Sequence, residues 1–143
     1  MLRDDRVRDF IFPSKIKAVN GDIFNAEALL KPSVLQIATV ETELMRVNGG
    51  GYVILDFGKE YYGGIRIITK RTSSDNRENV SYPLHIRFGE SITECSANLG
   101  EKNAGNDHAV RDMQVVLGSH SDMEFGNTGF RFVRLDFNEN MAI

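Results

Sequence analysis

From residue 34 onward, hydrophobic and polar residues follow the pattern of short β-strands separated by turns. Short apolar stretches alternate with segments of Gly, Asn, Asp and Ser, and these residue types favour turns. No stretch has the long amphipathic periodicity of a helix. The sequence therefore predicts about eight short strands in an all-β fold, a two-sheet sandwich of the jelly-roll type.

The clearest strand covers residues 84–88, where apolar and polar side chains alternate strictly. Leu84, Ile86 and Phe88 fall on one face, and His85 and Arg87 fall on the other. This period of two predicts a strand with one buried face. The alternation is repeated at residues 113–117 and, more loosely, at residues 65–70.

Two other stretches are apolar on both faces. Residues 52–57 are almost entirely apolar, so we expect this strand to be covered on both sides. In residues 130–137, Phe130 and Phe132 lie on one face, while the opposite face is also apolar from Val133 onward. Either a β-bulge shifts this alternation, or the second face packs on something beyond the sandwich, such as another domain.

The first 33 residues are the least periodic part of the chain and contain Pro13 and Pro32. We interpret residues 1–33 as an irregular lead-in segment, with one helical turn at residues 25–30 capped by Asn25. Residues 34–143 then form the sandwich. The whole chain of 143 residues has the length of a single domain.

Composition excludes several classes of protein. The net charge of −3 argues against sequence-independent nucleic-acid binding, and no apolar run approaches the roughly 18 residues of a membrane span. The single cysteine, Cys95, allows neither an internal disulfide nor a multi-cysteine zinc site. Residues 1–6 carry charges of both signs, which fits a cytoplasmic protein or an exported one whose signal lies outside this sequence.

Glu90 and Glu94 form the carboxylate pair that glycoside hydrolysis requires at a minimum. Such catalysis also needs a cleft that holds the sugar, and the chain has no tryptophan to line one. We therefore assign no catalytic residue to this chain. A small glycosidase in its own right stays open as a third interpretation, because the pair is present.

The candidate carbohydrate-binding residues are Tyr61, Tyr62, Asn106, Asp107 and Arg111. A tyrosine ring can stack on a sugar while its hydroxyl forms hydrogen bonds, and the other three residues offer donors and acceptors for sugar hydroxyls. The alternative is structural: the tyrosines belong to the core, and the polar residues close a loop through bonds to the backbone.

A structural calcium ion is also left open. Asp75, Asn76 and Glu78 could supply oxygen ligands, although their spacing does not fit the EF-hand pattern. We expect no other cofactor.

Four blocks of glycine-rich or polar sequence lie beside the predicted strands. They are Leu55-Asp56-Phe57-Gly58-Lys59-Glu60 followed by Gly63-Gly64, Ile86-Arg87-Phe88-Gly89-Glu90-Ser91, Asn106-Asp107-His108 with Arg111-Asp112, and Phe125-Gly126-Asn127-Thr128-Gly129-Phe130-Arg131-Phe132-Val133-Arg134. In their order and sum, these blocks resemble the N-terminal β-sandwich region of bacterial α-L-rhamnosidase-like glycoside hydrolases, a galactose-binding-like domain.

The resemblance implies a role without chemistry for this chain. Enzymes of that family hydrolyse terminal α-L-rhamnosyl linkages with inversion, using two carboxylates in an (α/α)6 barrel, which would lie after residue 143. The chain would be a non-catalytic accessory domain whose partner is that catalytic domain. The alternative function is a carbohydrate-binding module that recognises a rhamnose-containing or other glycan through its loops.

Overall fold

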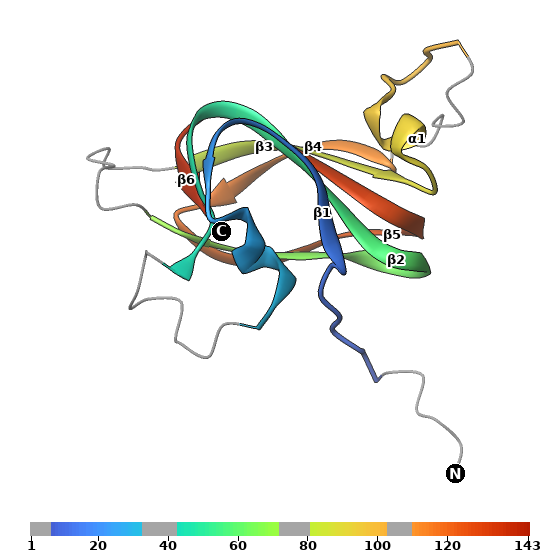
Figure 1. Cartoon of the computed structure of the whole chain (residues 1–143), viewed down its shortest axis with the longest axis horizontal. Helices are drawn as coiled ribbons and strands as arrows, with labels where there is room; N and C mark the ends of the chain where they lie inside the picture. The colour runs from blue at the N-terminus through green and yellow to red at the C-terminus, as the bar shows by residue number, and fades with distance from the viewer. Residues whose placement is uncertain (1–6, 33–42, 72–80, 103–109) are drawn as a thin grey trace.

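The computed structural model describes residues 7–32, 43–71, 81–102 and 110–143, and the statements below concern these residues. They form six strands and two short helical segments (Figure 1). The strands are β1 (Lys15–Phe24), β2 (Arg46–Lys70), β3 (Ser81–Gly89), β4 (Asp112–Gly118), β5 (His120–Phe137) and β6 (Met141–Ala142). The helical segments are η1 (Ala26–Leu30) and α1 (Ile92–Ser96). Within this described part, no helix is long and apolar enough to cross a membrane.

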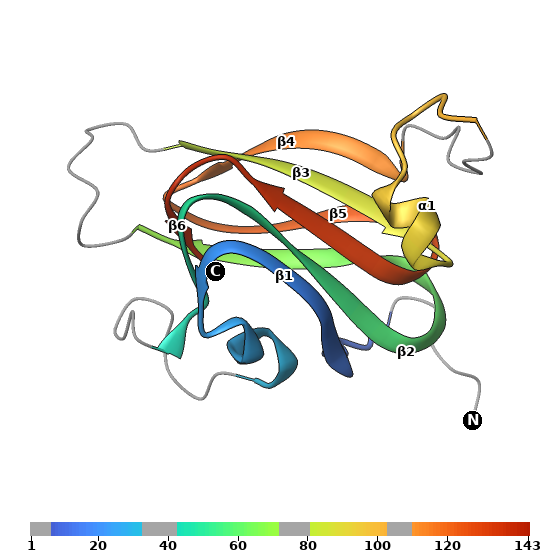
Figure 2. The same ribbon diagram turned by 45° about the horizontal axis from the view of Figure 1, so that its top comes forward.

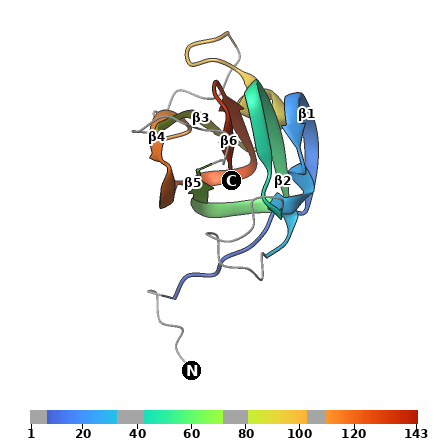
Figure 3. The same ribbon diagram turned by 90° about the vertical axis from the view of Figure 1, so that its left-hand side faces the viewer.

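The strands form one continuous sheet that folds back on itself into two layers. The strand order is β1-β2-β5-β3-β4, and β6 pairs in parallel with β2. β2 and β5 pair antiparallel along almost their whole lengths, from Gly51 opposite Phe137 to Lys70 opposite His120. Both strands bend, and Figure 3 shows β2 changing direction from one layer to the other. The predicted all-β sandwich is confirmed.

The strands are fewer and longer than the turn signals predicted. Residues 52–57 and 65–70, which the sequence predicted as separate strands, belong to the single strand β2 of 25 residues. Its pairing with β5 is interrupted between Asp56 and Tyr61 and again between Gly63 and Gly64. Gly58, at φ 85°, lies in the first interruption. Here glycine permits a bulge and a bend within a strand.

The expectation of an irregular segment over residues 1–33 is wrong for residues 15–24, which form β1 at one edge of the sheet. β1 pairs with β2 from Lys15 opposite Asp56 to Phe24 opposite Arg46, and its register shifts twice. These shifts and the exposure of most of its side chains hide the period of two in the sequence.

The predicted helical turn is present as η1. Asn25 occupies its N-cap position, but no hydrogen bond from its side chain caps the turn. The Asn25 amide instead donates to the carbonyl oxygen of Leu44, at 3.4 Å. The boundary that we predict between residues 33 and 34 lies outside the described residues.

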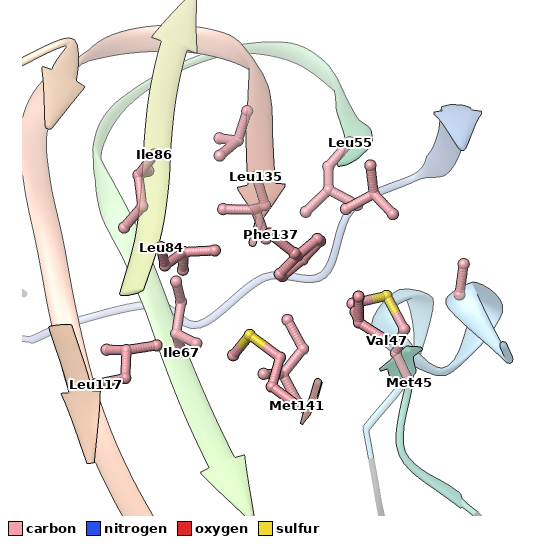
Figure 4. Close-up of a cluster of buried hydrophobic side chains, with 14 of the residues drawn as sticks. Met45, Val47, Leu55, Ile67, Leu84, Ile86, Leu117, Leu135, Phe137 and Met141 are labelled. Atoms are coloured by element: carbon pink, nitrogen blue, oxygen red, sulfur yellow. The ribbon is translucent and has the colours of Figure 1, made fainter. Parts of the chain in front are cut away.

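The core lies between the two layers, where side chains from five strands point toward one another (Figure 4). Leu84, Ile86 and Phe88 of β3 are all buried, as their alternation predicted. Ile67, in the second half of β2, and Met141 of β6 pack into the same cluster. The cluster therefore joins the two layers.

The two apolar faces of β5 are explained by a bulge and by α1. Phe130 lies in the main core, because the register shift opposite β2 breaks the alternation between Phe130 and Phe132. Phe132 faces the other way and packs with Ile54 and with Cys95 of α1. The bulge that we predicted as one alternative is confirmed. The far side of Phe132 is covered by this chain itself, so it gives no sign of a second domain.

Candidate functional site

Tyr61 and Tyr62 follow the first bulge of β2 and face opposite ways. Tyr61 pairs with Phe130, packs against the core, and has the Lys59 ammonium 5.2 Å from its ring centroid. Tyr62 pairs with Gly129 and is 78% exposed. Of the two tyrosines among the predicted binding residues, Tyr62 is the exposed one and Tyr61 is partly buried.

Arg111 lies directly before β4 and is held by hydrogen bonds and charge. Its Nε donates to Thr128 Oγ1 at 3.1 Å, and its Nη2 donates to Glu90 Oε1 at 2.8 Å. Its Nη1 lies 3.8 Å from Glu94 Oε2. The Arg111 carbonyl accepts a hydrogen bond from the backbone N–H of Phe88, at 2.8 Å. The guanidinium is therefore fixed between β5 and the start of α1.

Gly129 connects Tyr62 with this charged group. Paired residues in an antiparallel ladder point to the same face of the sheet, so Gly129 shares its face with Tyr62. A Cβ atom at Gly129 would lie 3.5 Å from Glu60 Oε1, and 3.8 Å from both Arg111 Nη2 and Glu90 Oε1. We call Tyr62, Glu60, Glu90, Arg111 and Gly129 the Tyr62 surface. It lies near α1, because Glu90 directly precedes Ser91, the N-cap residue of that helix; Figure 2 shows α1 at one end of the sandwich.

Glu90 and Glu94 both have structural partners. Ser91 is the N-cap of α1, and its Oγ accepts a hydrogen bond from Glu94 N at 3.2 Å. In return, Glu94 Oε2 accepts from Glu90 N at 2.8 Å. This arrangement is close to a capping box, which satisfies free N–H groups at the start of a helix. The carboxylate pair thus caps α1 and binds Arg111.

The remaining predicted ligands cannot be placed. Asn106 and Asp107, and the calcium candidates Asp75, Asn76 and Glu78, lie outside the described residues. In the ranges that are described, no group of three or more His, Cys, Asp or Glu side chains is arranged to hold a metal ion.

An ion pair with a buried carboxylate stabilises the bulge beside this surface. Asp56 has a fully buried side chain, and its Oδ1 accepts hydrogen bonds from Gly58 N at 2.8 Å and from Arg131 Nε at 2.9 Å. The hydrogen bonds from Arg131 hold the pKa of Asp56 below its ordinary value, against the opposing effect of burial. Lys15 Nζ adds a positive charge 3.8 Å from Oδ2.

A scan of the sequence against models of known protein families gives no match, and neither does a search of curated proteins. A search of solved structures does give matches. A rhamnosidase from Klebsiella oxytoca with rhamnose bound matches with a TM-score of 0.61 and 17% sequence identity, over 92% of this chain. This chain has the fold of a rhamnosidase domain.

The rhamnosidase domain fold confirms, at the level of fold, the resemblance found in the four sequence blocks. The match covers 26% of the Klebsiella rhamnosidase, so this chain spans about a quarter of that protein's length. The CBM32 of AlyQ in complex with 4,5-unsaturated mannuronic acid also matches, with a TM-score of 0.44 and 14% identity, over 90% of this chain and 95% of that chain.

Proposed function

We propose that this chain is a non-catalytic accessory β-sandwich domain of an α-L-rhamnosidase-like glycoside hydrolase, packing on a catalytic (α/α)6 domain outside this sequence. The observation that carries the proposal is the structural match, which covers nearly all of this chain and about a quarter of a rhamnosidase. That proportion is expected of one domain in a larger enzyme.

Contacts between the four sequence blocks support this proposal. Asp56 of the first block forms its ion pair with Arg131 of the fourth. Glu90 of the second block binds Arg111 of the third. Residues that carry the resemblance therefore make specific contacts with one another at one end of the fold, as parts of a single structural unit would.

The segment before β1 offers a surface for such packing. Val7, Phe10, Ile11 and Phe12 are 44–58% exposed. The segment contacts the second half of β2, where the Arg66 guanidinium lies 4.9 Å from the Phe10 ring centroid. Neighbouring exposed apolar side chains are typical of surfaces that contact another domain.

Hydrolysis of 4-nitrophenyl α-L-rhamnopyranoside tests whether this chain lacks catalytic activity of its own. We expect the chain alone to release no nitrophenol above the uncatalysed rate. Hydrolysis that Glu90→Gln or Glu94→Gln abolishes would instead favour a small glycosidase in its own right.

Calorimetry on the full natural gene product tests the packing. We expect Phe10→Ser combined with Phe12→Ser to lower the unfolding temperature of the catalytic domain or to separate its transition from that of the sandwich. Phe24→Ser, at the far end of β1, is the matched control and should do neither. A gene product without a helical catalytic domain would contradict the proposal.

A second candidate function is carbohydrate binding by this chain itself. The specific observation in its favour is that Tyr62, which is 78% exposed, pairs with Gly129. The guanidinium of Arg111 and the carboxylates of Glu60 and Glu90 border the position of a Cβ atom at Gly129.

A further inference from the structure

We propose that the Tyr62 surface binds a neutral pyranose sugar, with the Tyr62 ring against the sugar's apolar face and the side chains of Glu60, Glu90 and Arg111 bonded to its hydroxyls. This inference rests on the second candidate function and names its ligand class. It does not depend on the accessory role.

The Tyr62 ring is the first element of the site. Among the large hydrophobic residues that are described, Tyr62 is the most exposed, at 78%. Its strand neighbour Tyr61 packs against the core, so Tyr62 differs from the other aromatic ring at this bend in being exposed. Opposite Tyr62 stands Gly129, which has no side chain to cover the ring. An exposed, amphipathic ring of this kind suits stacking on a sugar.

The second element is a set of hydrogen-bonding groups beside the ring. Glu60 is exposed, and the Glu90 side chain is 48% exposed. A carboxylate accepts hydrogen bonds from two neighbouring hydroxyls, and a guanidinium donates to hydroxyl oxygens. The space above Gly129 is bordered by one oxygen of each carboxylate and by Arg111 Nη2. Acceptors and a donor therefore converge within reach of one sugar ring.

The third element is preorganisation. Arg111 is 15% exposed and is tied to Thr128 and Glu90, while Glu94 is tied to the start of α1. Groups already held in position lose little conformational entropy when a ligand binds. Arg111 and Glu90 are thus held in position before a sugar binds.

Charge selects the ligand class. The carboxylates of Glu90 and Glu94 lie 2.8 and 3.8 Å from the guanidinium of Arg111, and Glu60 Oε1 borders the same space above Gly129, so carboxylates outnumber the guanidinium there. A uronic acid would add a further negative charge to this excess and would be repelled. A neutral sugar makes the same hydrogen bonds without that repulsion.

Titration of the ¹⁵N-labelled chain, followed by NMR, tests the site with three sugars. D-Galactose and L-rhamnose are the neutral ligands, and D-galacturonic acid is the charged counterpart of galactose. We expect saturable shifts at Tyr62, Arg111 and Gly129 with a neutral sugar, and at least about tenfold weaker binding of the uronic acid. Absence of binding by both neutral sugars in the millimolar range would overturn the proposal.

Variants assign the binding to this surface. Tyr62→Ala should weaken binding at least about tenfold, and Gly129→Ala should weaken it by filling the space beside the ring. Phe24→Ala removes an exposed ring elsewhere and should change nothing. Glu60→Gln should narrow the preference for galactose over galacturonic acid. The site as assigned would be contradicted if Tyr62→Ala left sugar binding intact. An equal affinity of the wild type for galactose and galacturonic acid would also contradict it.

The proposed accessory role and the proposed sugar site can be refuted independently of each other. Loss of the sugar site leaves the rhamnoside assay and the calorimetry unaffected. A hydrolytic chain, or a gene product without a catalytic domain, would remove the accessory role and leave the titration result standing.

Discussion

Arg131 donates two hydrogen bonds to Asp56, from Nε to Oδ1 at 2.9 Å and from Nη2 to Oδ2 at 3.2 Å. The Asp56 side chain has no exposed surface, while that of Arg131 is 40% exposed. Asp56 also accepts from Gly58 N, inside the interruption of the β2–β5 register. The pair therefore ties the bulge of β2 to β5 at the bend between the two layers.

Removal of the Asp56 carboxylate should destabilise this bend. Asp56→Ala deletes the acceptor of three hydrogen bonds, two of them from a charged group, and we expect a loss of about 2–4 kcal/mol in the free energy of unfolding. Urea denaturation measures the loss. Asp122→Ala is the matched control, because its bidentate pair with Arg66 is exposed on both sides. A similar loss in both variants would contradict the special role of the buried Asp56 carboxylate.

The same pair should make stability depend on pH. Hydrogen bonds from Arg131 lower the pKa of Asp56 in the folded chain, so the folded state favours the ionised carboxylate. The stabilisation is complete above the unfolded pKa of about 3.9 and is lost as the pH falls through the folded pKa. We expect the stability difference between the wild type and Asp56→Asn to be constant above about pH 5 and to shrink below about pH 4. An equal difference at pH 7 and pH 3 would contradict this.

Phe130 should be one of the most sensitive positions of the core. Its ring makes edge contacts with Phe57 and Phe88, at centroid distances of 5.4 and 5.1 Å, and the residue is 3% exposed. Phe130→Ala should cost about 3–5 kcal/mol, because it leaves a cavity between two rings. Phe24→Ala, at an exposed site, should stay within about 0.5 kcal/mol of the wild type. Chemical denaturation of both variants, side by side, checks the contrast.

The sequence predicted the strands in which apolar and polar residues alternate without interruption. It missed, wholly or in part, strands in which a β-bulge or register shift interrupts that alternation. β3 was recognisable because Leu84, Ile86 and Phe88 all face the core without a register shift. β1 was not, because two shifts and an exposed edge erase its period. The fusion of two predicted strands into β2 depends on Gly58 lying in a bulge, and glycine has the same local signature in a bulge and in a turn.

The candidate site was predicted only where the residue type itself suggests a ligand. Tyr62 and Arg111 were named for their side chains, and the fold places both around Gly129. Glu60 and Gly129 could not be found in this way, since their role depends on the pairing of β2 with β5 across more than sixty positions of sequence. Such a register is fixed by the packing of the whole sheet and leaves no local signal.

Two glycines of β5 provide a test of that register. Gly126 has φ 107°, and a Cβ atom there would lie 2.9 Å from Phe88 Cζ. At Gly129 the nearest atom to a Cβ would be Glu60 Oε1, at 3.5 Å, which is ordinary contact. Gly126→Ala should therefore lower the free energy of unfolding by about 1–3 kcal/mol, whereas Gly129→Ala should leave it within about 1 kcal/mol.

Urea denaturation of the two alanine variants decides between this register and an alternative pairing. A one-residue slip of β5 would exchange the faces of the sheet on which these side chains lie. A stable Gly126→Ala together with a destabilised Gly129→Ala would therefore show that the register is wrong. It would also remove the basis for placing Tyr62 beside Arg111, because that neighbourhood depends on Gly129 standing opposite Tyr62.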